Sequence, residues 1–148
     1  MSLVLSPELK EIINGALAAH APMVLASVDA EGRPRLTFRG SIQAFSDDQL
    51  GFWARNPEGA TMDNIVANPH VAMILRNPET RVVLQLAGRA RLAEGEERDR
   101  VYANAPEFEQ RMDADKKGSG VVVDLDRVEG VLGLGADGQR RIVRLSRD

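Results

Sequence analysis

The stretch at residues 33–92 constrains the fold most, because apolar and polar residues alternate along its first part with a period of two. In RPRLTFRGSIQAF, residues 33–45, one face would carry Leu36, Phe38, Gly40, Ile42 and Ala44, and the other Arg35, Thr37, Arg39, Ser41 and Gln43. This period is typical of a strand with one buried and one polar face. We therefore expect a continuous strand here, with Leu36 and Phe38 in the core and Arg39 on the polar side.

More strands and one short helix follow within the same stretch. The predicted elements are a strand at residues 50–54, a two-turn helix at 61–68 that stops at Pro69, and strands at 70–75 and 81–92. Turn chemistry separates them, in the form of SDDQ at residues 46–49 and Asn-Pro at residues 77–78. Thr61 is expected to cap the helix that begins beside it.

The flanking segments complete the picture of a mainly antiparallel sheet. Ser6-Pro7-Glu8 predicts a helix start, and the apolar run at residues 23–28 predicts a strand buried on both faces. Short helices are expected at residues 95–105 and 107–112, separated by Pro106. A long strand at 121–134, bent at Gly130, and a last strand at 140–145 follow. About seven strands and three short helices, joined mostly by hairpins, favour a closed antiparallel sheet.

Length and charge limit the classes of function. At 148 residues with a net charge of −3, the chain is expected to form one domain, residues 1–148, and lacks the basic excess of nucleic-acid-binding proteins. No apolar run approaches the length of a membrane span, and no signal peptide is visible. The absence of cysteine excludes thiol catalysis and thiolate metal sites, and it fits a cytoplasmic protein.

Catalytic motifs are scarce, and the most interesting polar feature is a predicted anion-binding corner. The two histidines, His20 and His70, have no metal-ligand spacing, so no metal site is predicted and no catalytic residue can be assigned. Arg39, together with the start of the helix at Thr61, could bind a phosphate, and Trp53 could flank a flat aromatic ligand. The alternative is that Arg39 is a surface ion-pair partner and Trp53 a core residue.

The order of elements resembles the FMN-binding split-barrel family typified by pyridoxamine 5′-phosphate oxidase. The resemblance covers nearly the whole chain, and it is carried mainly by NIVANPHVAM at residues 64–73 and AGRARL at 87–92. It implies a mainly β protein, an antiparallel Greek-key split β-barrel with short flanking α-helices. It also implies a homodimer that binds FMN in a groove between the subunits.

Residue by residue, the resemblance implies a cofactor site that departs from the family pattern. Arg39 matches the strand arginine that reaches the flavin phosphate, Trp53 and Ala54 match an aromatic–threonine pair, and Gln85 could replace a flavin-contacting glutamine that aligns with Val83. The implied cofactor-binding residues are Arg39, Gly40, Ser41, Ile42, Trp53, Ala54, Arg55, Thr61, Met62 and Gln85.

The departures argue against a vitamin-salvage oxidase. Ala60 and Thr61 stand where the family has an Arg-Lys pair. Losing charged phosphate contacts, each worth about 1.5–3 kcal/mol, should weaken FMN binding. Restoring a lysine at Thr61 is therefore expected to tighten it.

Three functional hypotheses follow. The first is a dimeric FMN flavoprotein, an oxidoreductase that transfers electrons or hydride to or from a small substrate. The second is a non-catalytic split barrel that holds haem, a flavin-like ligand or nothing, and the third is a reductase that uses the deazaflavin F420. Apolar strands such as residues 23–28 and 70–75 offer more apolar surface than one small barrel should hide, which predicts the homodimer.

Overall fold

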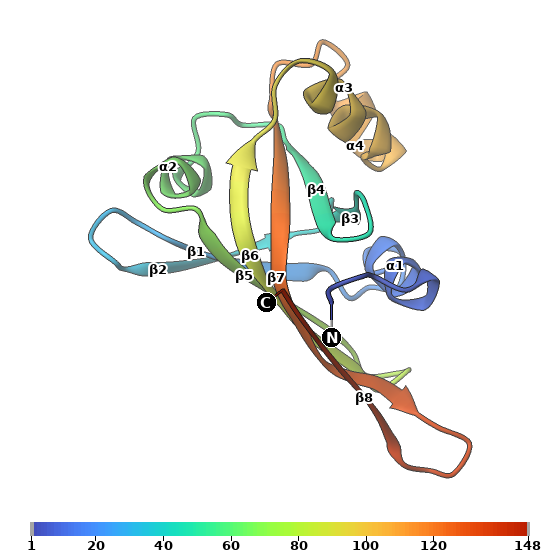
Figure 1. The fold of residues 1–148 in the computed structure, drawn as a ribbon. Helices are drawn as coiled ribbons and strands as arrows, with labels where there is room; N and C mark the ends of the chain where they lie inside the picture. The colour runs from blue at the N-terminus through green and yellow to red at the C-terminus, as the bar shows by residue number, and fades with distance from the viewer. Residues whose placement is uncertain (1, 148) are drawn as a thin grey trace.

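The computed structural model describes residues 2–147, which form one strongly curled antiparallel sheet with short helices around it (Figure 1). Its strands are β1 (Met23–Val28), β2 (Pro34–Arg39), β3 (Gln43–Ala44), β4 (Gln49–Ala54), β5 (His70–Asn77), β6 (Val82–Leu92), β7 (Ser119–Leu134) and β8 (Arg140–Ser146). The order in the sheet is β2-β1-β5-β6-β7-β4-β3, and β8 pairs with β7 alone. The predicted split barrel is confirmed. Within the described residues the two end strands, β2 and β3, do not pair with each other, so the barrel is open rather than closed.

The helices begin and end largely where local sequence chemistry predicts. They are α1 (Pro7–Asn14), α2 (Ala60–Ala67), α3 (Gly95–Asn104) and α4 (Glu107–Met112). The Ser6 hydroxyl accepts a hydrogen bond from the Leu9 N–H at 3.1 Å, so the predicted cap of α1 is confirmed. Helix α2 ends just before Asn68-Pro69, as expected from the restriction that proline places on the preceding residue.

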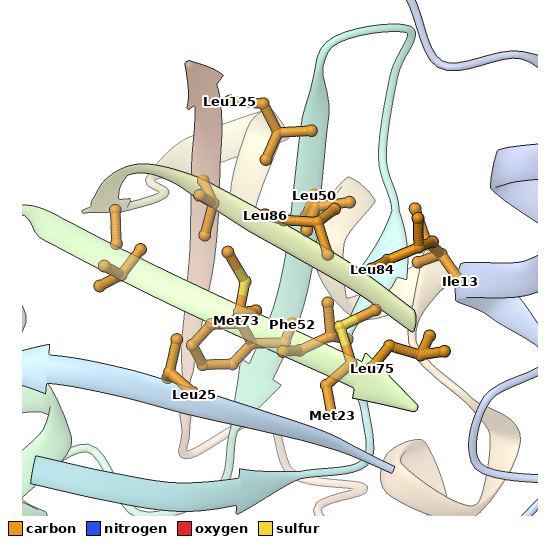
Figure 2. Close-up of a cluster of buried hydrophobic side chains, with 14 of the residues drawn as sticks. Ile13, Met23, Leu25, Leu50, Phe52, Met73, Leu75, Leu84, Leu86 and Leu125 are labelled. Carbon is orange, nitrogen blue, oxygen red and sulfur yellow. The ribbon is translucent and has the colours of Figure 1, made fainter. Parts of the chain in front are cut away.

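The main core fills the concave side of the sheet (Figure 2). Strand β6 contributes Leu84 and Leu86, which are fully buried between the neighbouring strands, and Ile13 reaches in from α1. A second, smaller core lies under α3, where Trp53 packs against Tyr102 with ring centroids 4.9 Å apart in an edge-to-face arrangement. Both clusters use β4, which therefore connects the barrel to the helical pair α3–α4.

Two glycines allow the long strands to bend. At the register shift between β6 and β7, a Cβ on Gly88 would lie 2.3 Å from the carbonyl oxygen of Asp124, so only glycine fits. Gly130 has a φ of +148°, and a Cβ there would lie 2.0 Å from the Val83 carbonyl oxygen. The predicted bend of β7 at Gly130 thus corresponds to a close approach of two backbones. Strand β6 pairs with β7 as far as Leu132, and β8 pairs with β7 as far as Leu134 (Figure 1).

The burial expected for the first strands is wrong in two respects. The predicted continuous strand ends at Arg39, and Leu36 and Phe38 are 71% and 73% exposed. Strand β2 is an edge strand that pairs only with β1, so one of its faces has no cover within this chain. Strand β1 alternates between buried and half-buried residues instead of being buried on both faces.

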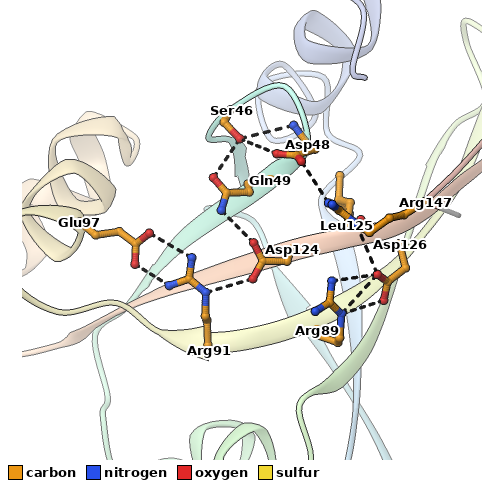
Figure 3. A network of polar contacts seen from close by, with 10 residues as sticks. All are labelled: Ser46, Asp48, Gln49, Arg89, Arg91, Glu97, Asp124, Leu125, Asp126 and Arg147. Atoms are coloured by element: carbon orange, nitrogen blue, oxygen red, sulfur yellow. Dashed lines mark hydrogen bonds and ion pairs between the residues drawn. The ribbon is translucent and has the colours of Figure 1, made fainter. Parts of the chain in front are cut away.

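The convex side of β6 and β7 carries a network of ion pairs (Figure 3). Arg91 donates hydrogen bonds to Glu97 at 2.6 Å and to Asp124 at 3.0 Å, and Gln49 donates to the other Asp124 oxygen at 2.8 Å. Arg89 forms a bidentate pair with Asp126. These side chains are partly exposed, so each pair contributes modestly, and the network mainly holds β4, β6 and β7 in register.

Candidate functional site

A groove of about 430 Å³ lies at the end of β2, between the turn that follows α1 and helix α4. Its lining combines three apolar side chains, two arginines, one carboxylate and small polar groups. These residues are Leu17, Phe38, Arg39, Gly40, Ser41, Arg55, Asn56, Phe108 and Glu109. The structure therefore brings together four of the ten predicted site residues, namely Arg39, Gly40, Ser41 and Arg55.

Arg39 is the most unusual of these residues. Its Nε atom is shielded from solvent and has no hydrogen-bond partner among residues 2–147. Its Cζ lies 5.1 Å from the ring centroid of Phe52, a cation–π contact that offsets part of the cost of burial. Burial lowers the pKa of the Arg39 guanidinium, and nearby Glu109 opposes this shift. An arginine remains charged at neutral pH all the same. A shielded cation without a partner is a position prepared for an anion.

Arg55 is the second cation of the groove, and it is already paired. Its Nε lies 2.6 Å from a carboxylate oxygen of Glu109, whose side chain is only 13% exposed. Its guanidinium also stands 6.0 Å from the ring centroid of Phe108. Both partners come from α4, so this helix covers one side of the groove.

The backbone that connects β2 to β3 forms another wall. A Cβ on Gly40 would come within 2.9 Å of the Leu17 side chain, so the glycine lets the turn after α1 approach the backbone closely. The next residue, Ser41, is buried at the groove with its polar side chain. Ile42, which follows, points into the main core instead.

Four further predicted residues lie in the two cores. Ile42, Ala54 and Met62 belong to the main cluster, and Trp53 belongs to the second one. The Trp53 indole donates a hydrogen bond to Asp113 at 2.8 Å, and Arg98 lies 4.8 Å from its ring centroid. The alternative interpretation of Trp53 as a core residue is therefore the one that the structure shows, and Trp53 can act on the groove only by positioning β4.

The expected cap at Thr61 is wrong. The N-cap of α2 is Gly59, and no side chain accepts a hydrogen bond there. Thr61 is the second residue of the helix, and only 6% of it is exposed. Since Gly59 has the extended backbone of a cap, the helix begins at Ala60, one residue before the threonine. Thr61 does not line the groove.

Gln85 lies in a second groove, of about 360 Å³, on the outer face of β5, β6, β7 and β8. Arg144, Glu129, Ile74 and Ile142 line it as well. One row of directly paired residues across six strands runs through Phe38, Val24, Ile74, Gln85, Glu129 and Arg144. Phe38, at one end of the row, lines the first groove, and the last four residues of the row line the second. Within one chain, strands β1 and β5 therefore separate the strand of Gln85 from that of Arg39.

Sequence reasoning missed half of the groove. Phe38 was assigned to the core, and Leu17, Asn56, Phe108 and Glu109 were assigned no part in a binding site, yet all five line the groove. The only local signal was the two-residue spacing of Phe38 from Gly40 on a predicted strand. Helix α4 carries no such signal, because the sequence of a short charged helix does not indicate where the helix packs in the fold.

Neither a metal-binding cluster nor a membrane-spanning helix is present within residues 2–147. No group of three or more histidine or acidic side chains within residues 2–147 could hold a metal ion. No helix in the part of the chain that the structure describes has the length and apolar character needed to span a membrane.

The sequence profile of the pyridoxamine 5′-phosphate oxidase family matches residues 5–132. Similar structures include PhzG from Burkholderia lata in complex with tetrahydrophenazine-1-carboxylic acid, at 16% identity and a TM-score of 0.69, covering 99% of this chain and 94% of that one. A haem-binding protein from Mycobacterium smegmatis follows at 20% identity and a TM-score of 0.70, covering 97% of this chain and 60% of that one.

A third similar structure is a pyridoxamine 5′-phosphate oxidase-related, FMN-binding protein from Nostoc punctiforme, at 15% identity and a TM-score of 0.64, with 93% of both chains covered. No curated protein matches the sequence. At such low identities these structural likenesses establish the fold, and the ligand must be argued from the groove itself.

Proposed function

Since the chain belongs to the pyridoxamine 5′-phosphate oxidase family, we propose that it is a homodimeric flavoprotein that binds FMN. Its reaction is the transfer of electrons or hydride to or from a small substrate. When bound, FMN supplies the redox chemistry, and the protein supplies binding, orientation and shielding from water. A cytoplasmic location stays a prediction.

The observation that carries the proposal is the unpartnered Nε of Arg39 in the groove. A guanidinium binds a phosphate monoester with charge-assisted hydrogen bonds, and such bonds are the strong ones in proteins. Ser41 and Asn56 add uncharged polar groups, while Phe38 and Leu17 offer apolar surface for a flat ring. The donor set therefore fits the phosphate of FMN, with Arg39 and Arg55 in place of the cation pair that this chain lacks at Ala60 and Thr61.

The dimer is supported by the outer face of the sheet. Five large apolar side chains lie exposed on this face, in four of its strands, namely Leu36, Phe38, Ile74, Val83 and Ile142. A twofold axis pairs a surface with a second copy of itself. Because the two grooves lie on different strands of the sheet, such a dimer can place the Gln85 groove of one copy beside the Arg39 groove of the other. FMN would then contact both chains.

The other ligands have weaker support in the groove. Haem usually takes a histidine, cysteine, methionine or tyrosine ligand to its iron. Both histidines, His20 and His70, are exposed, and neither they nor any of those other residue types lines the groove. F420 carries a phosphate too, so Arg39 does not discriminate it from FMN. The absorption spectrum of the purified protein separates a flavin from a haem.

The proposal is tested by titrating the protein with FMN and following flavin fluorescence. Arg39→Ala should weaken binding by about 10- to 100-fold, the equivalent of one charge-assisted hydrogen bond of about 1.5–3 kcal/mol. Arg35→Ala is the matched control, because Arg35 lies on the same strand and is exposed outside the groove. Equal affinities for the two variants would refute Arg39 as a phosphate ligand. An FMN affinity too weak to measure in the wild type would refute the flavoprotein.

A further inference from the structure

We propose that Glu109 is a resident counter-ion of the groove, which competes with the phosphate of an incoming ligand for the two arginines. The inference rests on the proposed function for the identity of the ligand, but it concerns any phosphate group that enters the groove. It makes Glu109 a determinant of ligand affinity and specificity, and it connects anion binding to the position of α4.

The geometry places one carboxylate where an anion has to bind. Glu109 and both arginines line the same groove, and the carboxylate of Glu109 lies 2.6 Å from the Nε of Arg55. The Nε of Arg39, by contrast, has no hydrogen-bond partner among residues 2–147. A phosphate that binds Arg39 therefore meets one guanidinium that is free and one that is already neutralised, with a negative charge beside it.

Ligand binding then requires an exchange of partners. The phosphate forms hydrogen bonds with Arg39 and Arg55, the ion pair between Arg55 and Glu109 breaks, and the Glu109 carboxylate moves into water. No proton is transferred, and no covalent bond forms or breaks. The carboxylate of Glu109 adds one negative charge close to the phosphate site. A dianion therefore binds less tightly than it would if residue 109 were neutral.

Helix α4 is built in a way that permits this exchange. It has six residues, Glu107–Met112, and none of them is buried. Its main attachments are polar: the Tyr102 hydroxyl donates to the Gln110 carbonyl at 2.9 Å, and the Gln110 side chain donates to the Ala105 carbonyl at 2.9 Å. Displacing Glu109 thus exposes little apolar surface, and the cost of moving the helix is low.

The chain contains a natural reporter of that movement. Trp53 is the only tryptophan, and its indole N–H donates to Asp113, the residue that directly follows α4. The backbone N–H of Gly118 donates to the same carboxylate oxygen at 2.8 Å. A shift of α4 on anion binding should therefore change the surroundings of the indole and with them its fluorescence.

The test is a titration with inorganic phosphate at constant ionic strength, followed by the fluorescence of Trp53. Glu109→Gln removes the charge and keeps the shape. Glu107→Gln is the matched control, because Glu107 lies on the same helix, 84% exposed, and pairs with Arg111 on the surface. We expect Glu109→Gln to bind phosphate about tenfold more tightly than the wild type, the order expected for removing one unit charge from a partly screened site. Glu107→Gln should stay within about twofold of the wild type.

Further variants and titrations with FMN separate this inference from the proposed function. Glu109→Asp keeps the charge, so it should retain wild-type affinity, and thermal melting checks that each variant is folded. If Glu109→Gln binds phosphate no more tightly than Glu107→Gln does, the inference is overturned. If Glu109→Gln gains phosphate affinity but no variant binds FMN, the role of Glu109 stands and the flavoprotein is refuted. If the wild type and Glu109→Gln bind FMN equally well, the flavoprotein stands and the inference fails.

Discussion

The proposed dimer can be tested at Leu36, at a distance from the groove. Leu36 lies on the edge strand β2, 71% exposed, and does not line the groove. Fully burying a leucine contributes about 1.5–3 kcal/mol, and a twofold interface contains the residue twice. Covering the 71% that is exposed is therefore worth about 2–4 kcal/mol per dimer, or about 30- to 1000-fold in the dissociation constant. Leu36→Asp removes this gain and adds two charges that would have to be desolvated.

The assay is sedimentation velocity over a dilution series in the micromolar range. Leu36→Asp should shift the equilibrium strongly toward the monomer, and FMN affinity should fall with it if the groove is shared between two chains. Val66→Asp is the matched control, because Val66 is also 71% exposed but lies on α2, away from the outer face of the sheet. A wild-type protein that is monomeric in this range, or a Leu36→Asp variant as dimeric as the control, would show that the reasoning is wrong.

Three further predictions concern pH and the start of α2. Burial alone would raise the pKa of Asp124, but hydrogen bonds from Gln49 and Arg91 bring it below its ordinary value of 3.8. The stability that ionised Asp124 contributes is therefore fully present above pH 3.8 and is lost as the pH falls through the lowered pKa. We expect Asp124→Asn to flatten the dependence of the melting temperature on pH between about pH 5 and pH 2. Ala60→Arg, at the exposed first position of α2, should tighten FMN binding in titrations, less so at high salt. Thr61→Lys is now expected to lower the melting temperature, because it places an ammonium at a position that is only 6% exposed.

The elements that could be predicted from the sequence are those whose chemistry is local. The helix start at Ser6 and the end of α2 before Pro69 each depend on a residue that acts within one turn. The hairpin after β1 is similar: the Asp29 side chain accepts hydrogen bonds from the backbone N–H groups of Glu31 and Arg33. Such signals do not depend on what the rest of the chain does.

The errors arose where burial depends on distant parts of the molecule. A period of two says which residues share a face of a strand, but it does not say which face the chain itself covers. Leu36 and Phe38 were assigned to the core for this reason, and on an edge strand they are exposed. Glu109 could not be found at all, because its role comes from the tertiary contact of α4 with Arg55, 54 residues earlier in the chain.

The charge balance of the groove links the family to the behaviour expected of this member. The resemblance alone implies a flavin phosphate held by several cations. In this chain one cation, Arg39, has no hydrogen-bond partner for its Nε among residues 2–147, and a second, Arg55, is already neutralised by Glu109. The start of α2 offers no cation at Ala60 and Thr61. Removing charged contacts and adding a carboxylate both lower the affinity for a dianion. A weakly held, exchangeable FMN is therefore more consistent with this groove than a permanent prosthetic group. In such a protein the occupancy of the groove would follow the concentration of free FMN, and α4 would respond to it.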